Sequence, residues 1–161
     1  MGCMTSAPKE VPAVADGKSR LCCAGYAGSA AVGYAKKLVL LVGTSKPERY
    51  ESFVYLTGPR DNAGFSKFVE ETVVPKLSAD DAARAKDPKV PLIWLERSDG
   101  TATLIGGVDE LKTWCQENLR DTEEVKELEQ KDPANPDYAT KSPGDITSAL
   151  TSGTSGTAIP K

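Results

Sequence analysis

Residues 91–119 read PLIWLERSDGTATLIGGVDELKTWCQENL, and they set the architecture of the whole chain. The apolar run Leu92–Leu95 predicts a strand that begins directly after Pro91, where the missing proline N–H costs least. The Ser-Asp-Gly step at 98–100 is typical of a hairpin turn, because Asp and Gly tolerate a positive φ. The alternating, β-branched residues 101–105 predict a second strand paired with the first.

A helix is predicted directly after the two glycines at 106–107. Its apolar residues recur at helical spacing: Val108, Leu111, Trp114, Cys115 and Leu119. These residues alone leave open whether the Val90-Pro91 bond is cis or trans, because an X–Pro bond has only a small preference for trans. Trans is the commoner state and is favoured on this basis.

This order of motifs resembles the C-terminal half of glutaredoxins, within the thioredoxin-like fold. Val90-Pro91 precedes a strand and hairpin, and Gly106-Gly107 precedes a helix with an acidic start at Asp109. The resemblance spans residues 90–119 and implies a cis proline within a mixed sheet flanked by helices, over residues 36–120. It also implies that glutathione or a substrate peptide binds at Val90, Pro91, Gly106, Gly107, Val108 and Asp109.

Composition restricts the class of protein. The chain has 161 residues, 39% hydrophobic and 27% charged, which suits one modest core with tails. The net charge of −3 argues against a nucleic-acid partner. Histidine, the commonest general base and metal ligand, is absent from the sequence, and the four cysteines lack CxxC spacing, so we predict neither a metal site nor a cofactor. With no long apolar run and no secretory signal, we expect a cytoplasmic protein with reduced thiols, free or within a cytoplasmically built assembly.

The two ends of the chain are predicted to be extended. Residues 1–35 form a Gly/Ala-rich arm whose start fits N-myristoylation at Gly2, with Cys3 as a palmitoylation candidate; the alternative is an ordinary N-terminus. Residues 121–161 form a charged helical extension followed by a Pro/Ser/Thr/Gly tail. Because such arms cannot bury a core of their own, we expect them to contact other protein subunits, or a membrane surface through an acylated N-terminus.

Between these ends the pattern predicts two strands and two helices. The apolar run Leu38–Val42, ended by Gly43, indicates a central buried strand, and residues 53–57 indicate a second one. Residues 63–77 form an amphipathic helix that Pro75 shortens, and residues 78–89 form a charged linker or short helix with Ser78 as its N-cap.

A redox site depends on where the first strand lies, because the nucleophilic cysteine of the resembled family follows that strand. If Leu38–Val42 is the first strand, the site falls in residues 45–48, which read SKPE and hold no thiol. The alternative places it at Cys22 or Cys23, with residues 27–37 as the first helix and 38–43 as the second strand. Cys115 is expected to be a buried thiol of the last helix.

We therefore favour a non-catalytic thioredoxin-like scaffold subunit of a large assembly, such as a virion shell or a ciliary complex. One alternative is a monothiol glutaredoxin-type oxidoreductase that uses Cys22 or Cys23 with glutathione. Another is a membrane-associated adaptor acylated at its N-terminus.

Overall fold

The computed structural model describes residues 13–86, 90–139 and 144–147. In chain order its elements are β1 (Ser19–Tyr26), α1 (Ala30–Ser45), β2 (Tyr50–Thr57), α2 (Asn62–Phe68), the π-helical turn η2 (Val69–Val73), the 3₁₀ turn η3 (Val74–Lys76), α3 (Ala79–Arg84), β3 (Leu92–Arg97), β4 (Ala102–Gly106), α4 (Val108–Asn118), α5 (Glu123–Glu129), the 3₁₀ turn η4 (Pro136–Tyr138) and β5 (Gly144–Thr147). Among the helices of this described part, none combines the length and apolar character that crossing a bilayer requires.

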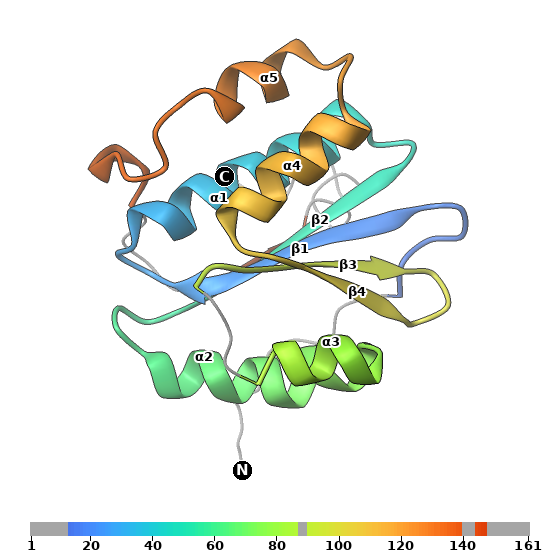
Figure 1. Ribbon diagram of the computed structural model, residues 1–161, viewed down its shortest axis with the longest axis vertical. Helices are drawn as coiled ribbons and strands as arrows, with labels where there is room; N and C mark the ends of the chain where they lie inside the picture. Colours follow the sequence, from blue (N-terminus) through green and yellow to red (C-terminus); the bar gives the residue numbers. More distant parts are fainter. Residues whose placement is uncertain (1–12, 87–89, 140–143, 148–161) are drawn as a thin grey trace.

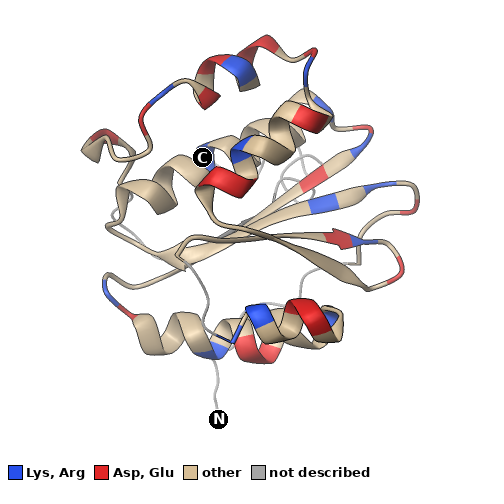
Figure 2. Cartoon of the chain, in the orientation of Figure 1, with Lys and Arg blue, Asp and Glu red and all other residues tan. Residues whose placement is uncertain are grey.

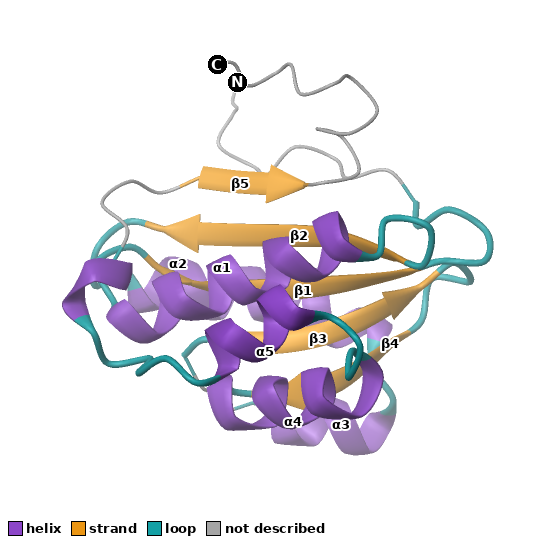
Figure 3. Cartoon of the chain, turned by 90° about the horizontal axis from the view of Figure 1, so that it is seen from above, coloured by secondary structure: helices purple, strands orange, loops and turns teal. Residues whose placement is uncertain are grey.

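The strands form one mixed sheet in the order β4-β3-β1-β2-β5. Strands β1 and β2 are parallel, β3 runs antiparallel to β1 and to β4, and β5 pairs antiparallel with β2. Helices α1, α4 and α5 lie on one side of the sheet, while α2 and α3 lie on the other (Figure 1). Figure 3 shows β5 beside β2, at the sheet border far from β4. The expectation of an α/β fold with a mixed sheet between helices is confirmed.

The C-terminal half forms as its sequence predicts. The strand, hairpin and strand are β3 and β4, and the helix is α4. The Val90-Pro91 bond, which the residues alone left open, is cis, as in the resembled family. Ser78 is the N-cap of α3, accepting a hydrogen bond from the Asp81 N–H. The helix predicted over 63–77 is present as three successive helical segments, α2, η2 and η3, the last with Pro75 in its first turn.

The strand predicted over Leu38–Val42 is wrong, because these residues belong to helix α1. The buried residues of α1 recur at helical spacing, including Val32, Ala35, Val39 and Val42. Leu40 and Leu41 lie toward α5, where they are half-buried. Since α1 packs against the sheet on one side and helices on the other, few of its central positions are polar, and the run resembles a buried strand.

The boundary expected between an N-terminal arm and a domain beginning at residue 36 is also wrong. Residues 19–26 form β1, which lies between β3 and β2 and is buried along nearly its whole length. The charged extension predicted after Arg120 is a separate helix, α5, whose Val125 is buried in the core with Leu119. The outermost parts of both predicted arms, residues 1–12 and 148–161, lie outside the described residues.

A buried ion network joins three strands of the sheet. Arg20 of β1 donates to Glu51 Oε1 of β2 from both Nε, at 3.1 Å, and Nη2, at 2.7 Å. Its Nη1 lies 3.7 Å from Glu96 Oε1 of β3, while Glu96 Oε2 accepts from Lys76 Nζ at 3.0 Å and Trp94 Nε1 at 2.9 Å. The Arg20, Glu51 and Glu96 side chains are 3%, 7% and 10% exposed. In Figure 2 the charged positions of β1, β2 and β3 lie toward the same end of the sheet.

Helix α3 covers the outer edge of β4. The Asp81 carboxylate accepts the backbone N–H of Leu104 at 3.1 Å and pairs with Arg84 within α3. Leu77 forms a parallel bridge with Ala102 at the same edge. An N–H on an edge strand otherwise faces solvent or another chain, so these contacts protect β4 from pairing with a second molecule.

The hydrogen bond from Arg84 to Asp81, followed by that from the Leu104 N–H, lowers the pKa of the Asp81 carboxyl below its usual range. A lowered folded-state pKa adds stability above the unfolded-state pKa of about 3.9, and that stability is lost as the pH falls through the folded value. Asp81→Asn is therefore expected to cost about 1 kcal/mol at pH 7. In urea titrations between pH 7 and pH 3, the difference from the parent protein should shrink below about pH 4.

Asp80→Asn is the matched control, because Asp80 is exposed on the same helical turn and the substitution removes the same charge. Its effect on the free energy of unfolding is expected to stay within about 0.5 kcal/mol. A cost for Asp81→Asn that is equally large at pH 3 would contradict the assigned role of the carboxylate charge.

Candidate functional site at one end of the sheet

The residues that the resemblance assigned to ligand binding come together at one end of the sheet. Ala24 lies opposite Leu92, so continuing the register places Pro91 beside Gly25, just before β1 ends. Ile93 lies opposite Gly106, which brings the end of β4 to the same place. The carboxyl ends of β1 and β4 and the start of β3 therefore meet here, where α1 and α4 begin.

The junction between β1 and α1 consists of Ala27, Gly28 and Ser29. Ser29 is the N-cap of α1, and its hydroxyl accepts the Val32 N–H at 3.3 Å. This junction follows the first strand, so it takes the position expected at residues 45–48, and that expectation is wrong. Residues 46–49 instead connect the far end of α1 to β2, and the Ser19 N–H bonds to Arg49 O there, at the start of β1.

The β4–α4 corner is shaped by its two glycines. Gly106 has φ +131°, in the region that favours glycine. The Gly107 N–H donates to Glu110 Oε1 at 2.8 Å. A carboxylate in the first turn of α4 therefore satisfies the backbone N–H of the helix's own N-cap residue. Of the predicted binding residues, Pro91 and Gly107 are buried, Val90, Gly106 and Val108 are half-buried, and Asp109 is exposed. These six residues therefore offer mainly backbone and apolar groups, with the exposed Asp109 carboxylate as the one charge among them.

The two neighbouring cysteines of the alternative redox site lie inside β1. Their side chains point to opposite faces of the sheet, Cys23 into the core cluster with α1 and Cys22 into the cluster with α2, and neither has measurable exposure. Burial raises the pKa of Cys23 to about 12, and burial, followed by the charge of Glu96, raises that of Cys22 well above its usual range. Thiolate, the form that attacks disulfides, is disfavoured at both positions.

Cys115 of α4 is a buried thiol, as the sequence predicted, and burial raises its pKa to about 12. The lipidation candidates Gly2 and Cys3 lie outside the described residues. Within the described residues, no group of three or more His, Cys, Asp or Glu side chains is arranged to hold a metal ion.

Sequence reasoning missed Ala27, Gly28 and Ser29 as the site's third component. The signal that could have found them is the Ser29-Ala30-Ala31 step, a serine N-cap directly before a helix-forming run. Comparisons with protein-family models, with curated proteins and with solved structures give no match for this chain.

Proposed function

We infer that this chain is a thioredoxin-like domain that works without thiol chemistry, as a protein-binding subunit of a larger, cytoplasmically built assembly. The strand order β4-β3-β1-β2, the antiparallel β3, the helix after β1 and the cis Val90-Pro91 bond support this assignment. The mixed sheet between helices, the helix after the first strand and the cis proline are features that the resemblance of residues 90–119 implies.

One observation carries the non-catalytic part of the proposal. At the start of α1, at the same end of the sheet as Pro91, the chain presents Ala27, Gly28, Ser29 and Ala30, where a redox domain of this type needs a cysteine. A helix N-terminus lowers a thiol pKa and so supplies thiolate, but a serine hydroxyl cannot exchange with a disulfide. The three described cysteines are buried and have raised pKa values.

The same end of the sheet suits an extended peptide. By the resemblance, the backbone before the cis proline and the Gly106-Gly107 corner contact the ligand in related domains. These groups recognise a peptide main chain without needing a reactive side chain. We therefore assign this end to contacts with protein subunits, and the outermost residues 1–12 and 148–161 to further contacts of the same kind.

The test is glutathione-dependent reduction of a mixed disulfide by the full chain. We expect turnover no faster than with glutathione alone, for the parent protein and for Cys3→Ser. Turnover in the parent protein that disappears in Cys22→Ala/Cys23→Ala, with the fold intact by circular dichroism, would instead establish the monothiol oxidoreductase. In the native state, a thiol-specific reagent should leave Cys22, Cys23 and Cys115 unmodified.

A gain-of-thiol variant tests the site's geometry separately. In a Cys3→Ser background, Ser29→Cys places a thiol at the N-cap of α1, and its pKa should fall below the ordinary value of about 8.5. Ser66→Cys on the exposed side of α2 is the matched control and should titrate normally. The pH dependence of thiolate absorbance distinguishes the two, and equal pKa values would argue against a redox-type position at residue 29.

A further inference from the structure

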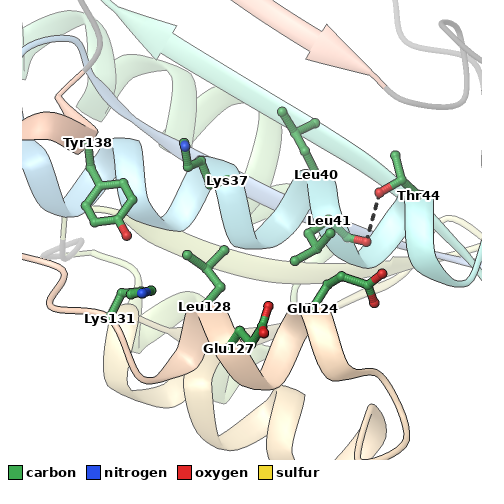
Figure 4. A pocket seen from close by; sticks show the side chains of 9 residues that line it. All are labelled: Lys37, Leu40, Leu41, Thr44, Glu124, Glu127, Leu128, Lys131 and Tyr138. Atoms are coloured by element: carbon green, nitrogen blue, oxygen red, sulfur yellow. Dashed lines mark hydrogen bonds between the residues drawn. The ribbon is translucent and has the colours of Figure 1, made fainter.

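A groove of about 510 Å³ runs between α1 and α5, and none of the predicted ligand-binding residues lines it (Figure 4). Its floor consists of Leu40 and Leu41 from α1 and Leu128 from α5. All three side chains are half-buried, so they present apolar surface that the described residues of this chain leave partly uncovered.

The two ends of the groove carry opposite charges. Lys37 and Lys131 lie at the end closed by Tyr138, and Lys37 Nζ stands 5.5 Å from the centroid of the Tyr138 ring. Glu124 lies at the other end, and Glu127 lies between it and Leu128 (Figure 4). All four charged residues are exposed, so an occupant that crosses the leucines meets positive charge at one end and negative charge at the other.

The shape of the groove suits a helix. Lys37 and Thr44 bound the lining of α1, and seven residues of helix rise about 10 Å, or two turns. On α5 and its continuation, the lining from Glu124 to Lys131 spans the same number of residues and runs in the opposite direction (Figure 4). A third helix lying between two antiparallel helices would place apolar residues spaced three and four apart on the leucines.

Other occupants fit less well. A second copy of the chain would bring one concave groove against another, which leaves the apolar floor uncovered. The segment 148–161 has one leucine, one isoleucine and no acidic residue to meet the lysines. The segment 1–12 has prolines at positions 8 and 12, which interrupt a helix.

We propose that this groove binds an amphipathic helix of a partner protein, with acidic side chains on Lys37 and Lys131 and basic side chains on Glu124 and Glu127. The inference goes beyond the proposed function, because it concerns another surface and holds whether or not the chain reduces disulfides.

Fluorescence anisotropy with a labelled peptide tests it on the full chain. The probe has about 14 residues, roughly four helical turns, with glutamates at one end, leucines spaced three and four apart in the middle and lysines at the other end. We expect saturable binding that is lost when the peptide leucines become serines. Lys37→Glu/Lys131→Glu should weaken binding roughly tenfold or more, because like charges then face the peptide's acidic end.

Lys67→Glu/Lys86→Glu is the matched control, with the same charge change at exposed positions of α2 and just after α3, on the other side of the sheet. It should bind the peptide as the parent does. The proposal is overturned if the parent shows no saturable binding, or if Lys37→Glu/Lys131→Glu binds equally well. It is also overturned if sedimentation shows a dimer that the groove variant alone dissociates, since the occupant is then a second copy.

Discussion

Arg20→Met is expected to lower the free energy of unfolding by about 3–5 kcal/mol. The substitution keeps most of the side-chain volume but removes the guanidinium that lies between two buried carboxylates, Glu51 and Glu96. Glu96 keeps Lys76 and Trp94 as partners. Among the described residues, Glu51 is left with the Ala15 N–H, which donates to its Oε2 at 3.2 Å, so its buried charge loses its cation. Urea denaturation at pH 7 measures the loss.

A second variant separates unpaired charge from lost packing. Arg20→Met/Glu51→Gln removes the carboxylate that Arg20→Met leaves unpaired, and it should recover about half of the lost stability. Lys126→Met is the matched control, because Lys126 forms an exposed ion pair with Glu123 on α5. It should lower the free energy of unfolding by less than about 0.5 kcal/mol. A cost below about 1 kcal/mol for Arg20→Met would mean that this network behaves like a surface ion pair.

Residues 91–119 could be predicted correctly because each signal in them is local. Pro91 marks the start of the strand, and Asp99-Gly100 marks the hairpin turn. Gly106-Gly107 marks the break between the second strand and α4. The α4 face has polar residues on its outer side, so its period of about 3.6 residues is visible. The β3–β4 hairpin pairs adjacent segments, and the further pairing of β3 with the distant β1 leaves both strands as the local signals predict them.

The N-terminal half could not be predicted in the same way, because its environment comes from distant segments. Helix α1 has few polar positions because the sheet packs on one side of it and α5, more than 70 residues later, packs on the other. Its two glycines also lower its helix propensity. Strand β1 reads SRLCCAGY, with no β-branched residue to favour a strand. Misplacing these two elements moved the candidate site to residues 45–48 and hid the groove, because Leu40 and Leu41 were expected inside a sheet.

Gly33→Ala is expected to detach η4 from α1 and to lower the free energy of unfolding by about 1–2 kcal/mol. A β-carbon at residue 33 would lie 1.5 Å from the carbonyl oxygen of Tyr138, so that backbone must move away. Alanine favours a helix by about 1 kcal/mol relative to glycine, which offsets part of an overpacking cost of typically 1–3 kcal/mol. The displaced segment also loses the edge-to-face contact between Tyr138 and Tyr34, whose ring centroids lie 5.3 Å apart.

Hydrogen exchange locates the change. Helix α5 is held separately, by the Tyr34 hydroxyl donating to Leu128 O at 2.6 Å and by buried Val125, so only the amides of Tyr138 and Ala139 should exchange faster. Gly58→Ala is the matched control, because a β-carbon there meets no atom within 4 Å, and its stability should match or slightly exceed that of the parent. Unchanged exchange and stability in Gly33→Ala would contradict the close approach of η4. If η4 does detach, Tyr138 leaves the lysine end of the groove, so peptide binding should weaken together with the protection of these amides.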